Sequence, residues 1–142
     1  MTGGRTLLTI IAFASVAVHL AAQDPLAQTA REKLIITQQL ARMGTGDLKA
    51  TVIQVHYGPD ERSIAHSHGC PVIVYVLNGT LRTQIKGRPV EYYGAGKAFY
   101  EAANAVHLIS ANASSIEPAN FLAFFICEPG AQLSTPVKEN SK

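Results

Sequence analysis

From residue 49 onward, apolar and polar residues alternate in short runs that are separated by turn residues. Alternation of this kind predicts strands with one buried face, because successive side chains point to opposite faces of a sheet. The run 72–77 ends in Asn78-Gly79, a pair that favours a hairpin with the next run. No long helical pattern interrupts the runs, so the sequence predicts an all-β sandwich or barrel. The predicted strands are 51–57, 72–77, 80–85, 90–93, 97–100, 107–110 and 121–127.

The segment before these runs is mixed, since residues 30–33 favour a helix and residues 34–37 favour a strand. Tyr75 and Tyr100 could contact a bound ligand, although packing is the more common role of aromatic residues in strands. The apolar side chains that we expect in the core are Val74, Val76, Leu77, Leu81, Ile85, Phe99, Leu108, Phe121, Phe124 and Ile126.

The first 22 residues have the layout of a secretory signal peptide. Arg5 precedes an apolar run over 7–18, and the small residues Ala21 and Ala22 follow it. The run is shorter than the roughly 20 residues of a membrane-spanning helix, although an uncleaved anchor is the alternative. We expect cleavage after Ala21 or Ala22 and a secreted or periplasmic protein with no membrane segment after cleavage. The predicted division is a signal peptide at 1–22, an arm with a first strand at 23–48, a barrel at 49–136 and a tail at 137–142.

Charge and cysteine content narrow the function classes. The formal net charge is only +2, and the lysines and arginines are scattered, so a nucleic-acid partner is not expected. Export would permit a disulfide between the two cysteines, Cys70 and Cys127. Pairing requires their Cα atoms to lie within about 7 Å, which the sequence leaves open.

Two histidines stand two residues apart just before the run 72–77. His66 and His68 share a face if the segment is extended, because side chains alternate across a strand. His107 belongs to another predicted strand, far along the chain. Two imidazoles from one strand and a third from a distant strand can hold a transition-metal ion. The alternatives are an accidental pair on a solvated strand and a loop position for His107.

The spacing of these residues resembles that of the cupins, small jelly-roll barrels with a metal ion in the barrel mouth. The resemblance covers residues 58–112 and is closest to small quercetin-dioxygenase-like cupins. In the second motif, Ala102 replaces the usual proline and Asn104 the usual glycine, but asparagine tolerates a positive φ. The residues that match the two motifs are Gly58, His66, His68, Gly79, Gly96, His107 and, one position late, Asn112.

The chain departs from the first motif at Val72, where the resemblance places a metal-binding glutamate. Valine offers no ligand atom, so the resemblance implies a site of three histidines, as in cupins that cleave diketones or oxidise thiols. Glu101 could act as a substitute carboxylate, although a hydrogen-bonding or ion-pairing role on the barrel rim is the expectation. Cys70 could supply a thiolate ligand, although a buried or loop cysteine is the expectation.

The leading functional hypothesis is an exported, metal-binding, dioxygenase-like oxidoreductase that acts on a small organic molecule. The expected cofactor is a divalent transition metal, Fe²⁺ first, with manganese, nickel, copper or zinc as alternatives. Three neutral imidazoles leave the ion its full charge, which favours an anionic substrate. The other hypotheses are a non-catalytic module that binds a small molecule or a metal, a cupin that has lost its metal, and a metal-dependent isomerase or lyase. The resemblance also implies a homodimer, and no catalytic residue beyond the metal ligands is identified.

Overall fold

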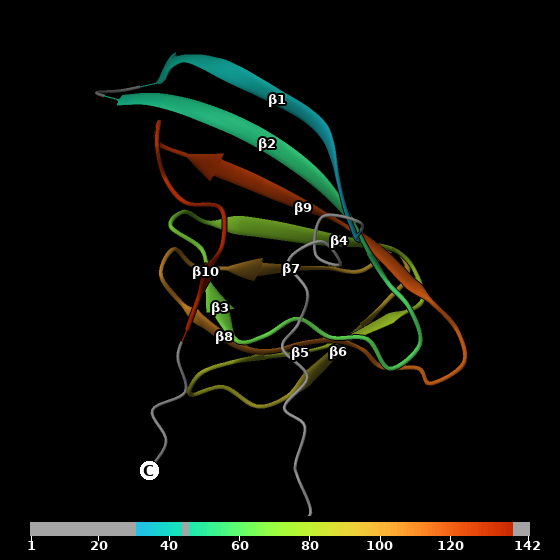
Figure 1. Cartoon of the computed structure of the whole chain (residues 1–142). Helices are drawn as coiled ribbons and strands as arrows, with labels where there is room; N and C mark the ends of the chain where they lie inside the picture. Colours follow the sequence, from blue (N-terminus) through green and yellow to red (C-terminus); the bar gives the residue numbers. More distant parts are fainter. Residues whose placement is uncertain (1–30, 44–45, 138–142) are drawn as a thin grey trace, which may run out of the picture.

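The computed structural model describes residues 31–43 and 46–137, so the predicted signal peptide lies outside the described residues. The chain forms two five-stranded antiparallel sheets, and the described part is all-β (Figure 1). The first sheet has the order β1 (Glu32–Met43), β2 (Gly46–Tyr57), β9 (Ala119–Cys127), β4 (Val72–Asn78) and β7 (Ala98–Glu101). The second has the order β10 (Thr135–Pro136), β3 (His66–Ser67), β8 (Val106–Asn112), β5 (Thr80–Ile85) and β6 (Glu91–Gly94).

The predicted alternation is clearest in β4 and β9, which are central strands of the first sheet. Val72, Val74 and Val76 of β4 are buried, and the residues between them are exposed. Burial alternates in the same way along β9, where Phe121 and Phe125 pack into the core. The two strands therefore present one apolar face to the interior, and this face forms one wall of the site described below.

The expected core is correct only in part. Leu77, Leu108 and Ile126 are exposed because each is the immediate neighbour of an inward-facing residue and so points to the outer face of its sheet. Tyr75 and Tyr100 are exposed on the outer face of the first sheet and do not reach the interior. Of the other expected core residues, Val74, Val76, Leu81 and Phe121 are buried, and Ile85, Phe99 and Phe124 are half-buried.

The hairpin predicted at Asn78-Gly79 is not formed. β4 pairs with β7 and β9, whereas β5 pairs with β6 and β8, so the turn carries the chain from one sheet to the other. Gly79 has a φ of 75°, and a Cβ there would lie 2.5 Å from the carbonyl oxygen of Pro118. The glycine thus permits a sharp turn against the loop before β9. The Asn-Gly pair forms a turn as predicted, but this turn connects two sheets and not two paired strands.

The helical tendency of residues 30–33 is also overruled, since β1 begins at Glu32. Lys33 pairs with Gln54 of β2, and the ladder continues as far as Met43. Strand pairing along a long partner outweighs a short local preference. In the described ranges, no helix has the length and apolarity needed to cross a membrane.

Candidate metal centre

Three histidines from two neighbouring strands converge inside the barrel. β3 pairs with β8 so that His66 lies directly opposite His107, and His68 follows just after β3. One ligand nitrogen from each ring lies within 4.8 Å of the other two. His68 and His107 are buried, with 8% and 3% of their surface exposed. The structure thus brings together all three residues that the sequence indicated as metal ligands.

Each imidazole is oriented by a hydrogen bond from its other nitrogen. Nδ1 of His66 lies 2.8 Å from the carbonyl oxygen of Ile64, and Nδ1 of His68 bonds the carbonyl oxygen of Leu133. A carbonyl only accepts, so Nδ1 carries the proton in both rings, and in the neutral form Nε2 has a free lone pair. Backbone carbonyls that fix the tautomer in this way are characteristic partners of metal-binding histidines.

His107 is held in the opposite sense. Its Nε2 lies 2.6 Å from the hydroxyl oxygen of Thr83 on β5, the neighbouring strand. If Nε2–H donates to Thr83, the lone pair is on Nδ1, the nitrogen that lies 3.1 Å from Glu101 Oε2. All three rings can therefore present a lone pair to one point.

A buried carboxylate contacts two of the three histidines. Glu101, the last residue of β7, is 3% exposed. Its Oε2 lies 3.3 Å from Nε2 of His68 and 3.1 Å from Nδ1 of His107. The expected position on the barrel rim is thus wrong, because β7 pairs with β4 and places Glu101 directly opposite the inward-facing Val72. A carboxylate at position 101 reaches the face from which position 72 also projects.

The unpaired atoms of this cluster match what a cation needs. Among the described residues, Glu101 Oε2 and His107 Nδ1 are buried without a hydrogen-bond partner. Buried polar atoms are nearly always paired, so two such atoms that face one another can share a cation. Nitrogen and oxygen donors together suit first-row transition metals. The residues present therefore fit a divalent transition metal.

The cluster shifts the pKa values of its members. Burial lowers the pKa of His66 to about 4, which keeps this ring neutral and able to bind a metal at neutral pH. Burial would by itself raise the pKa of Glu101, but the adjacent His107 and His68 outweigh it and lower the pKa to about 2. Burial likewise opposes the charged form of His68, yet Glu101 and the Leu133 carbonyl raise its pKa.

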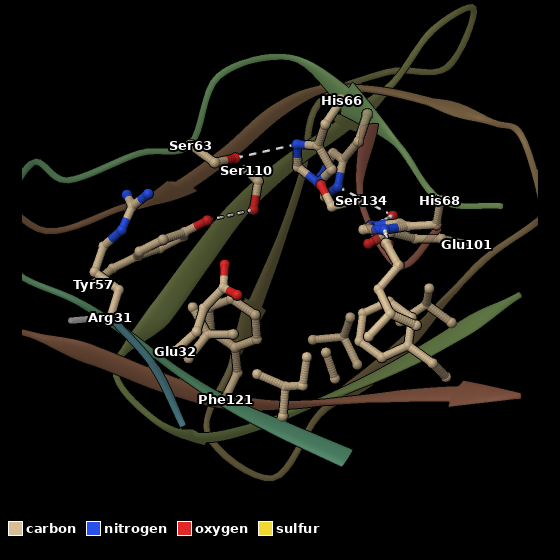
Figure 2. A pocket seen from close by; sticks show the side chains of 18 of the residues that line it. Arg31, Glu32, Tyr57, Ser63, His66, His68, Glu101, Ser110, Phe121 and Ser134 are labelled. Carbon is tan, nitrogen blue, oxygen red and sulfur yellow. Dashed lines mark hydrogen bonds and ion pairs between the residues drawn. The ribbon is translucent and has the colours of Figure 1, made fainter. Parts of the chain in front are cut away.

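The histidine cluster opens into a cavity of about 150 Å³ (Figure 2). His68 and Glu101 lie at one end of this cavity, and Tyr57 and Arg31 lie at the other. Between them the walls are largely apolar and come from the inner face of the first sheet. These wall residues include Ile53, Val55, Val72, Val74, Phe121 and Phe125.

Tyr57 supplies a polar group that the sequence analysis did not single out. Its side chain is buried at the end of β2, and its hydroxyl lies 3.1 Å from the hydroxyl of Ser110 on β8. Burial raises the pKa of Tyr57, so the phenol stays protonated and can donate a hydrogen bond. The guanidinium of Arg31 lies 5.7 Å from the ring centre and pairs with Glu61 at 3.2 Å. The signal was present, because Tyr57 shares strand parity with the inward-facing residues of β2.

Cys70 is not available as a thiolate ligand. It forms a disulfide with Cys127, and the two Cα atoms are 5.1 Å apart. The bridge ties the loop after β3 to the end of β9, and its sulfurs are buried in the core. Whether Cys70 and Cys127 pair was left open by the sequence. The structure shows that they do, and the disulfide lies only two residues beyond His68.

The turn that leads to His107 keeps its shape despite the departures from the second motif. Asn104 has a φ of 62°, as expected for asparagine in place of glycine. Its backbone N–H donates to the carbonyl of His68 at 2.7 Å, so this turn also supports a neighbouring ligand. Asn112 is buried and donates to the carbonyl oxygens of Gly58 and Glu117, which joins the two motif regions.

Known structures share this fold at low sequence identity. A Klebsiella pneumoniae protein with a double-stranded β-helix domain is 16% identical, with a TM-score of 0.58 over 77% of this chain and 84% of its own. A DMSP lyase from Ruegeria pomeroyi is 14% identical, with a TM-score of 0.57 over 86% and 59%. A cupin superfamily protein from Desulfitobacterium hafniense is 10% identical, with a TM-score of 0.50 over 66% and 77%. These likenesses establish the fold alone.

Sequence comparison identifies the family. Among curated proteins, none matches the chain significantly. The family model described as Cupin domain matches residues 53–125, which is more than half of the chain and includes all three histidines and Glu101. The double-sheet barrel and the convergence of residues from the two motifs agree with this match. The chain therefore belongs to the cupin family.

Proposed function

We propose that the protein is an exported, metal-dependent cupin enzyme that oxidises a small organic molecule in a dioxygenase-like reaction. The observation that carries this proposal is the histidine cluster in a partly open, largely apolar cavity. His66, His68 and His107 would hold the ion, each with its other nitrogen already bonded to protein. When bound, the ion supplies a Lewis acid and, in the case of iron, a redox centre.

The cavity limits the size of the substrate. Its volume of about 150 Å³ is comparable to that of an engineered protein cavity of ~150 Å³ that binds benzene. A substrate of one ring or a short carbon chain is therefore favoured over a flavonol with several rings. The apolar wall of Val74, Phe121 and Phe125 would cover its carbon skeleton and exclude water.

Export is supported by the disulfide. Disulfides persist in oxidising compartments and are rare in the cytosol of mesophiles. The buried pair Cys70–Cys127 agrees with the signal peptide proposed for residues 1–22. The secreted or periplasmic location thus remains part of the proposal, with two independent supports.

A metal-dependent lyase or isomerase is the second candidate, and Tyr57 favours it. Its protonated hydroxyl lines the cavity that the histidines also line, so a proton donor is available beside the substrate. A lyase or an isomerase uses such a group, whereas a dioxygenase does not require one. Turnover in the absence of oxygen would separate the two candidates.

The first test is elemental analysis of the mature domain, purified without a histidine tag, beside His107→Ala and the control His56→Ala. His56 is exposed and bonds Asn120 outside the cluster. We expect near-stoichiometric metal in the parent and the control, and none in His107→Ala. The metal-loaded parent is then assayed for oxygen uptake with small diketones and thiols. Absence of metal after reconstitution with several divalent ions would refute the enzyme proposal and favour a non-catalytic binding module.

A further inference from the structure

The carboxylate of Glu101 lies on a different strand from the glutamate that the first cupin motif would provide. It lies on β7, whereas the glutamate expected from the resemblance would lie on β4 at position 72. Val72 and Glu101 are direct cross-strand partners, and both are almost completely buried, at 1% and 3% exposed. Directly opposed residues on one face of an antiparallel pair have Cβ atoms roughly 5 Å apart. A glutamate on either strand can therefore bring its carboxylate to the same point inside the barrel.

We infer that Glu101 is the fourth protein ligand of the metal centre, an inference that rests on the proposed metal-dependent function. Its Oε2 lies 3.3 Å from Nε2 of His68 and 3.1 Å from Nδ1 of His107. Ligand atoms bound at about 2.0–2.2 Å in tetrahedral or octahedral geometry are roughly 3.0–3.4 Å from their neighbours. The observed separations match those of adjacent atoms in a coordination shell as well as those of an ion pair.

The chemistry of these atoms requires either a proton or a metal ion between them. Nδ1 of His68 donates to the Leu133 carbonyl, so Nε2 of the neutral ring is an acceptor. It faces a carboxylate oxygen, which is also an acceptor, and two acceptors repel unless a proton or a metal ion lies between them. Glu101 Oε2 and His107 Nδ1, which lie 3.1 Å apart, also lack a hydrogen bond, so a proton or a metal ion is needed there as well.

The fourth ligand changes the charge of the site and hence the substrate class. Three neutral imidazoles and one carboxylate give a centre of net charge +1 with a divalent ion, rather than +2. Such a centre is neutralised by a single anionic oxygen, for example that of a monocarboxylate, an enolate or a phenolate. Within a cavity of about 150 Å³, we infer a small substrate that carries one acidic group.

The test compares Co²⁺ binding by the parent, Glu101→Gln and the double variant Val72→Glu/Glu101→Val, with Glu61→Gln as control. Glutamine keeps the shape of the side chain and removes the charge, and the double variant returns the carboxylate to β4. Glu61 is also a glutamate in an ion pair, with Arg31, but does not line the cavity. The readouts are the affinity in competition with a chelator and the visible absorption of bound Co²⁺, and folding is checked by circular dichroism.

We expect Glu101→Gln to bind Co²⁺ at least about 100-fold more weakly, because loss of even an outer partner of a ligand lowers affinity by about 10–100-fold. The double variant should recover most of the affinity and the absorption of the parent, and Glu61→Gln should match the parent. Parent-like affinity and absorption in a folded Glu101→Gln variant would overturn the inference, even if its stability falls. If Glu101→Gln does not fold, a folded double variant without recovered affinity would also overturn it. Failure of the parent to bind metal would instead refute the proposed function.

Discussion

Reduction of the Cys70–Cys127 disulfide is expected to lower the unfolding free energy of the metal-free protein by about 4 kcal/mol. The bond closes a loop between residues separated by 57 positions. For a loop of this length, the chain-entropy model gives roughly 4 kcal/mol at 25 °C, from the freedom that the unfolded chain regains. Single domains have unfolding free energies of about 5–15 kcal/mol, so this loss would be a large share of the total.

The assay is urea unfolding followed by circular dichroism, with the parent measured in oxidising and in reducing buffer. Both cysteines are buried, so reduction leaves packed thiols in place and isolates the effect of the covalent link. The variant Cys70→Ala/Cys127→Ala is the control, because reductant should not change its unfolding free energy. The variant should be less stable than the reduced parent, since its smaller side chains leave space in the core.

A difference of less than about 1 kcal/mol between the oxidised and reduced parent would refute the reasoning. It would mean that the unfolded chain is already restricted, or that contacts in the folded barrel hold the loop after β3 without the bond. A reductant effect of equal size in the control variant would show that the change has another origin.

Three further outcomes are expected. Thr83→Val should weaken Co²⁺ binding about 10–100-fold, measured by chelator competition, because His107 loses the partner of its Nε2. Tyr57→Phe should raise KM for the physiological substrate more than it lowers kcat, as measured by steady-state kinetics, if the phenol only positions the substrate. A fall in kcat alone, together with a changed pH profile, would instead assign the phenol a role in proton transfer. Acidification from pH 6.5 to 4 should destabilise the metal-free protein, because the unfolded chain binds a proton that His66, with its pKa lowered to about 4, excludes when folded. The slope of unfolding free energy against pH in this window should be smaller in His66→Gln, and an unchanged slope would contradict this assignment.

The sequence was informative where one local rule decides the structure. Alternation along β4 and β9 is simple, and it predicted both strands correctly, but only Val74, Val76 and Phe121 of their buried residues. The H-x-H spacing and the distant His107 led to the cluster because the jelly-roll topology places β3 beside β8. The positive φ at Asn104 followed from the known tolerance of asparagine.

The sequence was less informative where pairing between strands decides the structure. Asn78-Gly79 indicated a turn but not that its two strands enter different sheets. Leu77 and Ile126 were expected in the core because they are hydrophobic. Hydrophobicity alone does not show which face of the sheet a residue near the end of a strand occupies. The role of Glu101 depends on the pairing of β7 with β4, which no local pattern states. The disulfide likewise depends on a distance between chain segments far apart in sequence.

The pairing of Val72 with Glu101 has a consequence for how cupin sequences are compared. Two residues directly opposite one another are separate columns in an alignment, yet they are almost one place in the barrel. If Glu101 binds the ion, a comparison that requires glutamate at position 72 would count this chain among cupins without a complete metal site. A comparison that treats the two columns as one would keep it with the four-ligand members. A carboxylate that is exchanged between adjacent strands would then change its position in the sequence, while the set of metal ligands stays the same.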